Sequence, residues 1–319
     1  MHPLYIDWQP DEVLFRVGSL AVRWYALGWV GGVFIAYLLA RWIYRREGVD
    51  PAPTRQGHLE YTGKFEPLVI YCFVGMLIGA RLGHCLFYEP GYYLTSLKGV
   101  IEMILPISFA PDSWAVTFRG YAGLASHGGV VGLICALLLY VRHMRLPLWW
   151  VLDVIGVVAA APSCCIRLGN LMNSEIVGRP TEVPWAFVFH LSGDLHTYGH
   201  YIPRHPAQLY EAIAYLVILL ATLLIYVRTN PTSSPTPSRS TRLGTGFYFG
   251  LCLATIFTFR FFIEFLKEVQ GGADDGSTLL DMGQMLSLPF VALGLWCMLR
   301  RPGDRRPGDR QPRTKHPAR

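Results

Sequence analysis

The stretch CCIRLGNLMNSEIVGRP, residues 164–180, places a polar cluster directly after a long apolar run. Its polar members include two arginines, two asparagines and a glutamate, at Arg167, Arg179, Asn170, Asn173 and Glu175. Arginine carries a permanent charge on a planar group whose fork of N–H donors matches a phosphate. The stretch therefore indicates a binding site for a phosphate-bearing ligand.

Two histidines occur in similar polar motifs. His127 lies in SHGGVVG, and His205 begins HPAQLYEA, which also carries Gln208, Tyr210 and Glu211. A neutral imidazole accepts a proton near pH 7, so each histidine is a candidate general base. Arginine and histidine together suggest a reaction on a phosphate ester in which a proton is removed from an acceptor.

The elements that must position these side chains are membrane-spanning helices. Of the 319 residues, 52% are hydrophobic and only 16% are charged, whereas about a quarter are charged in soluble domains. A helix needs about 20 residues to cross a bilayer, and seven apolar runs approach this length: residues 20–44, 67–88, 123–141, 148–166, 208–227, 244–265 and 282–299. Because a backbone in lipid must satisfy its own hydrogen bonds, we predict an all-α fold of seven transmembrane helices.

Lysine and arginine are distributed unevenly among the loops. The loops after the first, third and fifth runs and the C-terminal tail hold 18 of the 28 basic residues. Such an excess marks the cytoplasmic side. The sequence thus predicts an outside N-terminus, a cytoplasmic C-terminus and a periplasmic polar head region. The N-terminal stretch lacks a basic region followed by an apolar one, so we expect no cleavable signal peptide.

Polar side chains gather toward one side of the predicted membrane region. They are Arg23 and Tyr25, Arg81 and His84, His127, the 167–179 cluster, the HPAQLYEA motif, Arg260 and Glu264, and Gln284. One such residue could merely bond a neighbouring helix or reach the headgroups, and Arg260 and Glu264 could pair at i,i+4. Clustering across the predicted helices, with only Asp153 toward the opposite end, instead predicts a polar cavity open to the outer leaflet, where the phosphate ester would be a phospholipid headgroup.

Composition excludes several other classes. The formal charge of +6 lies mainly in the predicted cytoplasmic loops and tail, so we expect no nucleic-acid partner. The seven cysteines lie in apolar runs without the spacing of metal ligands. We expect them to be small buried apolar residues, and we predict neither a metal site nor a cofactor. We divide the chain into a transmembrane catalytic domain, residues 1–300, and a basic tail, residues 301–319.

Eight motifs, in order along residues 1–297, give this chain a family resemblance. They are HPLYIDW, RWYALGW, GARLGHCLFYEP, SHGGVVG, IRLGNLMNSEIVGRPT, HPAQLYEA, RFFIEFLKE and DMGQMLSLP. Together they resemble the prolipoprotein diacylglyceryl transferase family. Two positions depart from its usual signature: Leu171 replaces an aromatic residue and Ser174 replaces a glycine. A third, Ile256, stands where a tyrosine is common.

The resemblance implies a seven-helix enzyme of the bacterial inner membrane. Such enzymes move the diacylglyceryl group of phosphatidylglycerol to the lipobox cysteine thiol of a prolipoprotein signal peptide, forming a thioether and releasing glycerol phosphate. It also implies that Arg167 and Arg260 are essential and that His127 is the candidate base. Residues implied to bind phosphatidylglycerol are Tyr25, Asn170, Asn173, Glu175, Gly178, Glu264, His205, Gln208 and Tyr210, together with Arg167.

Two other functions use the same residues. A transporter for an anionic solute would bind it through arginines within the membrane, although we find no inverted repeat and no polar series reaching the cytoplasmic side. A purely structural helix bundle leaves the one-sided polar set unexplained. The sequence also leaves open whether His127, His205 or neither takes the thiol proton.

Overall fold

The computed structural model describes residues 5–18, 20–50, 63–105, 107–109, 114–118, 123–230, 243–268 and 280–300. The chain divides into two compact units. The main unit comprises Met1–Arg46 and Trp149–Arg319, and the small unit comprises Glu47–Leu148. The predicted tail, residues 301–319, lies outside the described residues.

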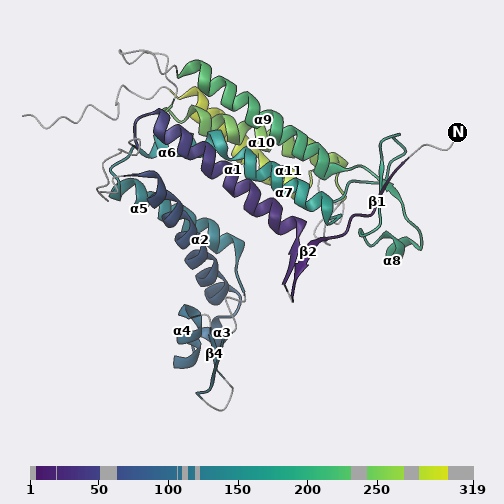
Figure 1. Ribbon diagram of the computed structural model, residues 1–319, viewed down its shortest axis with the longest axis horizontal. Helices are drawn as coiled ribbons and strands as arrows, with labels where there is room; N and C mark the ends of the chain where they lie inside the picture. Colours follow the sequence, from purple (N-terminus) through teal and green to yellow (C-terminus); the bar gives the residue numbers. More distant parts are fainter. Residues whose placement is uncertain are drawn as a thin grey trace, which may run out of the picture. The chain divides into compact units, whose positions relative to one another are not determined.

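The main unit is a bundle of long helices with short strands at one end. Figure 1 shows α1, α7, α9, α10 and α11 side by side. The helices are α1 (Trp24–Arg46), α6 (Leu148–Val158), α7 (Ala160–Met172), α8 (Asp194–Tyr198), α9 (Ala207–Thr229), α10 (Phe247–Ile263), the 3-10 turn η1 (Glu264–Leu266) and α11 (Met282–Leu299). The strands are β1 (Ile6–Trp8), β2 (Val13–Val17), β3 (Leu20–Arg23), β6 (Phe187–Phe189) and β7 (Pro203–Arg204).

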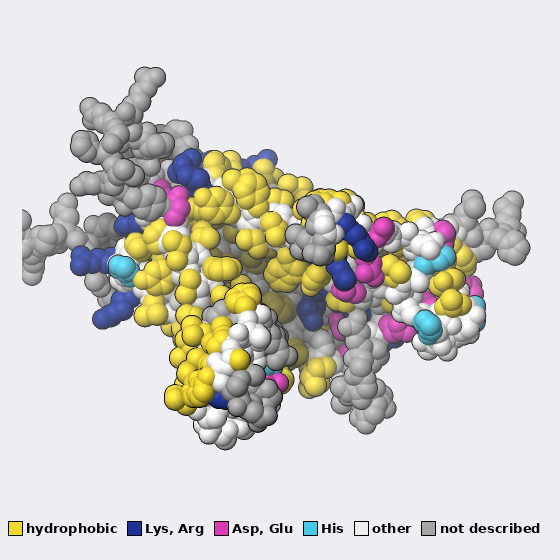
Figure 2. Space-filling view, turned by 60° about the horizontal axis from the view of Figure 1, so that its bottom comes forward, with side chains coloured by type: hydrophobic (Ala, Val, Ile, Leu, Met, Phe, Trp, Pro, Cys, Tyr) yellow, Lys and Arg dark blue, Asp and Glu magenta, His cyan; other side chains and the backbone are white. Residues whose placement is uncertain are grey.

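Six helices among the described residues are long and apolar enough to cross a membrane. They are Trp24–Arg46, Phe65–Phe87, Leu148–Met172, Ala207–Thr229, Phe247–Leu266 and Met282–Leu299. Hydrophobic side chains cover the helices, and charged side chains lie mainly near helix ends (Figure 2). The arrangement is that of a polytopic membrane protein. The remaining predicted span, residues 123–141, falls on a shorter apolar helix, His127–His143. The count of seven therefore stays a prediction.

A buried carboxyl group fixes the start of α10. Asp153, on α6, is fully buried and accepts hydrogen bonds from the backbone N–H groups of Gly244 (2.7 Å), Gly246 (2.9 Å) and Phe249 (3.0 Å). The first N–H groups of a helix have no partner within the helix. Asp153 supplies that partner from another helix, which gives a structural reason for a carboxyl group at this end of the bundle.

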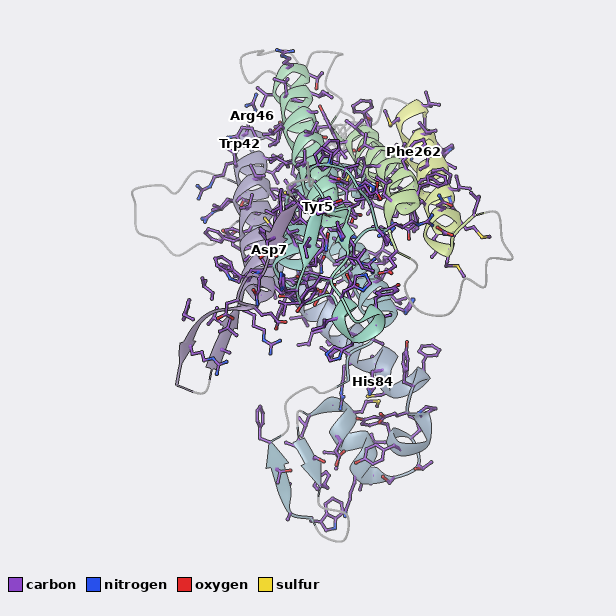
Figure 3. All side chains as sticks on the ribbon, turned by 90° about the vertical axis from the view of Figure 1, so that its right-hand side faces the viewer. Tyr5, Asp7, Trp42, Arg46, His84 and Phe262 are labelled. Atoms are coloured by element: carbon purple, nitrogen blue, oxygen red, sulfur yellow. The ribbon has the colours of Figure 1, made fainter. Side chains whose placement is uncertain are left out.

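Aromatic and cationic side chains join α1 to α9 at the same end. Trp42 and Tyr226 meet edge to face with their ring centroids 5.7 Å apart. The guanidinium carbon of Arg46 lies 5.2 and 5.5 Å from the centroids of these two rings, and Arg46 donates to the carbonyl of Asn230 at 2.9 Å. Trp42 and Arg46 lie close together near the end of α1 in Figure 3. Cation–π contacts thus secure the ends of these helices.

The short strands are a feature that the all-α prediction missed. Strand β6 lies between β1, to which it is parallel, and β7, to which it is antiparallel. The Trp8 indole N–H donates to the carbonyl of Leu171 at 2.9 Å and so ties this sheet to the end of α7. The strands of the main unit have two to five residues, and β1 and β6 pair across a large sequence separation, so hydropathy gave no signal for the sheet.

The beginning of α1 also differs from the prediction. Residues Leu20–Arg23 form β3, which pairs with β2 as an antiparallel hairpin. The first long helix therefore begins at Trp24. Arg23 lies on β3, and its Nη1 atom is 3.8 Å from Glu12 Oε2. The hairpin residues are as apolar as a helix end, which explains why the predicted run began at residue 20.

The small unit is built on two closely packed helices. Its elements are α2 (Phe65–Phe87), α3 (Pro90–Tyr93), α4 (Leu97–Ile104), β4 (Ile107–Phe109), β5 (Val116–Phe118) and α5 (Ser126–His143). A Cβ added at Gly79 would collide with the carbonyl of Gly128, and one at Gly132 would collide with that of Gly75. Glycine at four-residue spacing therefore lets the backbones of α2 and α5 meet directly.

Candidate functional site

The end of α7 carries a chain of polar contacts that begins at Arg167. Arg167 and Asn170 are three residues apart and share a helix face, and Arg167 Nη1 donates to Asn170 Oδ1 at 3.3 Å. The Asn170 and Asn173 amides donate to the two carboxylate oxygens of Glu175 at 2.9 and 3.0 Å. The helix extends to Met172, beyond the predicted end at residue 166. The extension places the arginine and Asn170 on a rigid element.

A sharp reversal follows α7. Ser174 and Ile176 have φ values of 52° and 58°, in the left-handed region that favours glycine. The Glu175 N–H donates to the Asn170 carbonyl at 3.0 Å, and the fully buried Gln208 side chain donates to the Glu175 carbonyl. Ser174 occupies a position where the family signature often has glycine, and its φ explains why glycine would suit this turn.

Gly178 lies where three segments meet. Its N–H donates to the His205 carbonyl at 2.9 Å, and it forms an antiparallel bridge with Lys267. A Cβ on Gly178 would lie 2.6 Å from the Cβ and carbonyl oxygen of His205 and 2.7 Å from the carbonyl oxygen of Leu266. The requirement for glycine therefore comes from close backbone packing, which sets the position of the loop beside Arg167.

A buried arginine, Arg204, braces the same crossing. Its guanidinium donates to both carboxylate oxygens of Asp194, at 2.8 and 2.7 Å, and to the Gly178 carbonyl at 3.2 Å. Glu268 lies 3.0 Å from Nη1. Burial opposes the charge of Arg204, but the two carboxylates outweigh burial and raise its pKa. Sequence inspection did not single out Arg204, although its position directly before the HPAQLYEA motif could have suggested a role.

Arg167 also belongs to a buried ionic network. Its Nε lies 3.1 Å from Glu211 Oε2, and Glu211 Oε1 lies 3.2 Å from Lys267 Nζ. The Tyr215 hydroxyl donates to Glu211 Oε1 at 3.2 Å. Glu264, expected as a headgroup ligand or as a partner of Arg260, lies in η1 with its Oε2 3.6 Å from Lys267 Nζ. Four charged groups thus form one cluster at the ends of α7, α9 and α10.

Arg260 and Tyr25 lie beside this network. Arg260 is in the last turn of α10, and both it and Arg167 lie within electrostatic range of the Tyr215 hydroxyl. Tyr25, at the start of α1, packs closely on the backbone at Gly169. The structure therefore brings both arginines and Tyr25 to the same end of the bundle.

His205 and Tyr210 border an adjoining cavity. The His205 Nδ1 atom lies 3.3 Å from the Tyr210 hydroxyl, which also accepts a hydrogen bond from the Trp185 indole at 2.8 Å. Burial lowers the pKa of His205, so its neutral form is favoured. The cavity, of about 420 Å³, is mainly aromatic and aliphatic and also includes Phe259 and Phe262.

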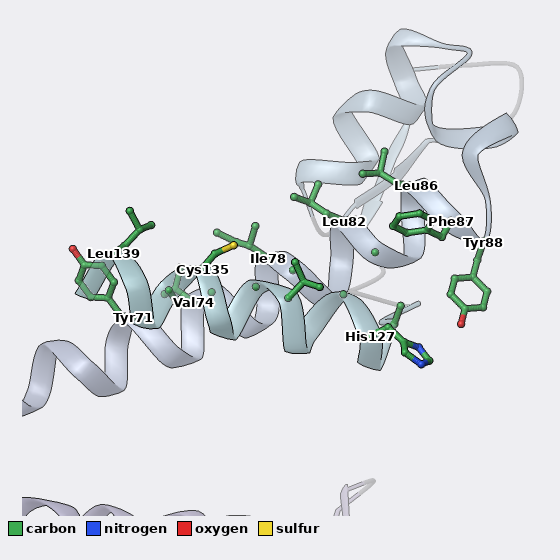
Figure 4. A pocket seen from close by; sticks show the side chains of 18 of the residues that line it. Tyr71, Val74, Ile78, Leu82, Leu86, Phe87, Tyr88, His127, Cys135 and Leu139 are labelled. Carbon is green, nitrogen blue, oxygen red and sulfur yellow. The ribbon is translucent and has the colours of Figure 1, made fainter. Parts of the chain in front are cut away.

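His127 belongs to the small unit and lies in the first turn of α5. It is exposed and borders an apolar groove of about 980 Å³ between α2 and α5. Figure 4 shows His127 and Tyr88 at one end of this groove and Tyr71 and Leu139 at the other. The predicted base is thus on a different unit from Arg167, and its catalytic role stays a prediction.

A buried arginine organises the chain next to His127. Arg81, on α2, donates to the Glu102 carbonyl at 2.7 Å and to the Gly123 carbonyl and Tyr93 hydroxyl, each at 3.4 Å. The Glu102 carboxylate in turn accepts from the Tyr92 hydroxyl at 2.6 Å. Arg81, one of the polar residues of the sequence cluster, therefore holds α2, α4 and the approach to α5 together.

No group of three or more His, Cys, Asp or Glu side chains that could hold a metal ion occurs in the described part of the chain. All seven cysteines are free, and four of them are buried. Cys135 is exposed on α5, contrary to the expectation that every cysteine would be buried. What the site offers chemically is a set of fixed arginines, carboxylates and amides beside an apolar cavity.

Comparison with known proteins agrees with the resemblance. A family model described as prolipoprotein diacylglyceryl transferase matches residues 12–300. The chain belongs to this family. It is 48% identical over 296 residues to the phosphatidylglycerol–prolipoprotein diacylglyceryl transferase of Bacteroides fragilis, covering 92% of this chain and 95% of that protein. The family membership confirms the resemblance drawn from the eight motifs.

Other relatives carry the same name. The protein of Tolumonas auensis is 37% identical over 293 residues, covering 92% of this chain and 96% of its own length. That of Porphyromonas gingivalis is 38% identical over 308 residues, covering 93% and 95%. These relatives support an enzyme and not the anion transporter, and with the apolar helices they indicate a multi-pass membrane protein.

Proposed function

We propose that this chain transfers the diacylglyceryl group of phosphatidylglycerol to the lipobox cysteine thiol of prolipoproteins. The relatives are named for phosphatidylglycerol and prolipoprotein. The observation that supports the proposal most directly is the cluster around Arg167 at one end of an apolar bundle, next to an apolar cavity. A phospholipid has the same division, with an anionic headgroup and apolar chains.

The proposed step is a displacement at carbon. The cysteine thiol loses its proton, the sulfur attacks the carbon that carries the phosphate, and the C–O bond breaks. Its electron pair leaves with the oxygen of glycerol phosphate, and a thioether remains. Negative charge grows on that oxygen, and Arg167 and Arg260 would stabilise it in a site of low dielectric constant.

The surrounding residues have supporting roles in this proposal. Asn170, Asn173 and Glu175 would fix the headgroup through the loop after α7, and Gln208 and Gly178 hold that loop in place.

The space around the headgroup would be lined by Tyr25, Glu264, His205 and Tyr210. A free thiol has a pKa of about 8.5, so removal of its proton is helped by a base. His127 is the first candidate and His205 the second.

Transfer of diacylglycerol from phosphatidylglycerol to a lipobox peptide tests the proposal. Protein in vesicles should form a thioether-linked lipid peptide and release glycerol phosphate, both detectable by mass spectrometry. Solute flux without thioether formation would instead support a transporter.

The candidate base is tested in the same assay. His127→Ala should lower the single-turnover rate by about 10²–10⁴ if His127 is the base. A normal rate for correctly inserted protein would transfer that role to His205 or remove the need for a base.

The proposed location is the bacterial inner membrane, with the Arg167 end facing the periplasm. The basic loops and tail support this orientation, with α5 as the seventh span. A cysteine introduced at Ser277, which lies outside the described residues, should react with a membrane-impermeant reagent in intact spheroplasts. Labelling only after lysis would indicate the opposite orientation in the membrane.

A further inference from the structure

Lys267 is a buried cation held between two carboxylates. Its side chain is 7% exposed, and its Nζ lies 3.2 Å from Glu211 Oε1 and 3.6 Å from Glu264 Oε2. Its backbone is fixed by the bridge to Gly178. Lysine is almost never buried unless it is paired. Lys267 therefore has a defined position, and its ammonium group is directed at the partner of Arg167.

Glu211 stands between two cations. The side chain is fully buried, with Arg167 Nε 3.1 Å from one oxygen and Lys267 Nζ 3.2 Å from the other. The Arg167 contact is an ion pair without an aligned hydrogen bond, because no described residue donates to Glu211 Oε2. The Lys267 contact is a hydrogen bond. Glu211 is thus anchored to Lys267 and shared with Arg167.

This sharing changes the charge that Arg167 presents. A buried carboxylate with Arg167 as its only cation would neutralise that arginine, and a phosphate would have to displace it. With Lys267 present, the negative charge of Glu211 is balanced from the other side, because Lys267 is hydrogen-bonded to Glu211 at 3.2 Å, whereas Glu264 lies 3.6 Å away without a hydrogen bond to it. The ammonium group itself is too buried to serve as the main ligand of a headgroup. The Arg167 side chain is more exposed, at 13%, than the Lys267 side chain, at 7%.

We propose that Lys267 is a positioning residue that holds Glu211 so that Arg167 keeps its positive charge for the lipid phosphate. The inference rests on the proposed function, since it assumes that Arg167 binds the headgroup. A purely structural role for Lys267, as a counter-ion that keeps η1 in place, is the competing explanation. The two explanations differ in how the effect of removing Lys267 depends on Glu211.

A double-mutant cycle separates them. The variants are Lys267→Met, which keeps the apolar stem, Lys267→Arg, Glu211→Gln, and the double variant Lys267→Met/Glu211→Gln. Full-length protein is assayed for thioether formation with a lipobox peptide over a range of phosphatidylglycerol concentrations. Thermal unfolding in detergent reports folding, and Arg167→Lys serves as the control for the headgroup site.

We expect Lys267→Met to lower kcat/KM at least tenfold, mainly through a higher KM for phosphatidylglycerol. Lys267→Arg should stay within about threefold of the unchanged protein, because a guanidinium keeps the positive charge that balances Glu211. Adding Lys267→Met to Glu211→Gln should change kcat/KM less than about threefold, since the neutral amide introduced by Glu211→Gln leaves no charge to balance. The comparison of Glu211→Gln with the double variant still tests the inference if Lys267→Met alone does not fold.

Two results would overturn the inference. One is an equal loss from Lys267→Met in the presence and in the absence of Glu211→Gln, which indicates a structural role. The other is a normal kcat/KM in folded Lys267→Met while Arg167→Lys is slowed, which leaves the proposed function intact. If the unchanged protein forms no thioether, the proposed function fails and the inference falls with it.

Discussion

The two ends of the main unit each bury a carboxyl group, but they satisfy it in different ways. Asp153 accepts three hydrogen bonds from backbone N–H groups at the start of α10. Glu211, at the other end, contacts the side chains of Arg167, Lys267 and Tyr215. Backbone donors are fixed by the helix, whereas a cationic side chain can exchange one anion for another. The comparison leads us to expect that Asp153 serves stability and that Glu211 serves the proposed site.

The largest effect should come from the arginine beside Glu211. Arg167→Lys keeps the charge but loses the planar fork, so we expect single-turnover transfer at saturating lipid to fall at least tenfold, toward the roughly 10²–10³ typical of a lost charge-stabilising contact. Thermal unfolding should change little. Arg179→Lys is the matched control, because Arg179 is half exposed and bonded to the Lys267 carbonyl. A normal rate for Arg167→Lys with an inactive Arg179→Lys would contradict the assignment of Arg167 and would indicate that the headgroup binds nearer to Arg179.

The next effect should fall on stability at the opposite end. Asp153→Ala leaves three backbone N–H groups without their acceptor, at a cost of about 3 kcal/mol. We expect a lower thermal unfolding temperature in detergent, with the transfer rate per folded molecule preserved. Ser163→Ala is a mild control, since its hydroxyl donates to the Ala159 carbonyl within the same bundle. Loss of transfer in fully folded Asp153→Ala would break the distinction between the two ends.

The smallest effect concerns pH. Burial lowers the pKa of His205, so the unfolded chain takes up a proton first as the pH falls through about 6.5. The contribution of His205 to stability is therefore complete above that pH and declines below it. His205→Gln should flatten the dependence of the unfolding temperature between about pH 7.5 and 5.5 by a small amount. An unchanged or steeper dependence would mean that another group dominates this range.

Much of the fold followed from hydropathy, since a run of apolar residues in lipid has few alternatives to a helix. The clustering of Arg167, Asn170, Glu175 and Gln208 could also be anticipated from their positions near helix ends. The role of Lys267 could not, because a lysine after an apolar run normally signals a solvated end. Its partner Glu211 is 56 residues away, and no local pattern encodes such a contact.

The division into two units was also beyond sequence inspection. The apolar runs look alike, and nothing in their composition separates α2 and α5 from the other helices. The structure separates them, because α2 and α5 pack on each other within the small unit. His127 therefore belongs with Arg81 and Gly123 structurally, whereas its motif suggested only a role shared with Arg167.

The crossing at Gly178 has a consequence for how the protein is made. The Arg179 backbone N–H donates to the Leu266 carbonyl at 2.8 Å, and its side chain donates to the Lys267 carbonyl at 2.9 Å, 88 residues later in the chain. When the ribosome has just synthesised the loop after α7, it has not yet produced Leu266 and Lys267, to which Arg179 of this loop is hydrogen-bonded. The nascent chain therefore carries an unfinished site through the insertion of α9 and α10. The proposed site is complete only when residue 267 has been synthesised, so we expect a chain that ends before it to lack transfer activity.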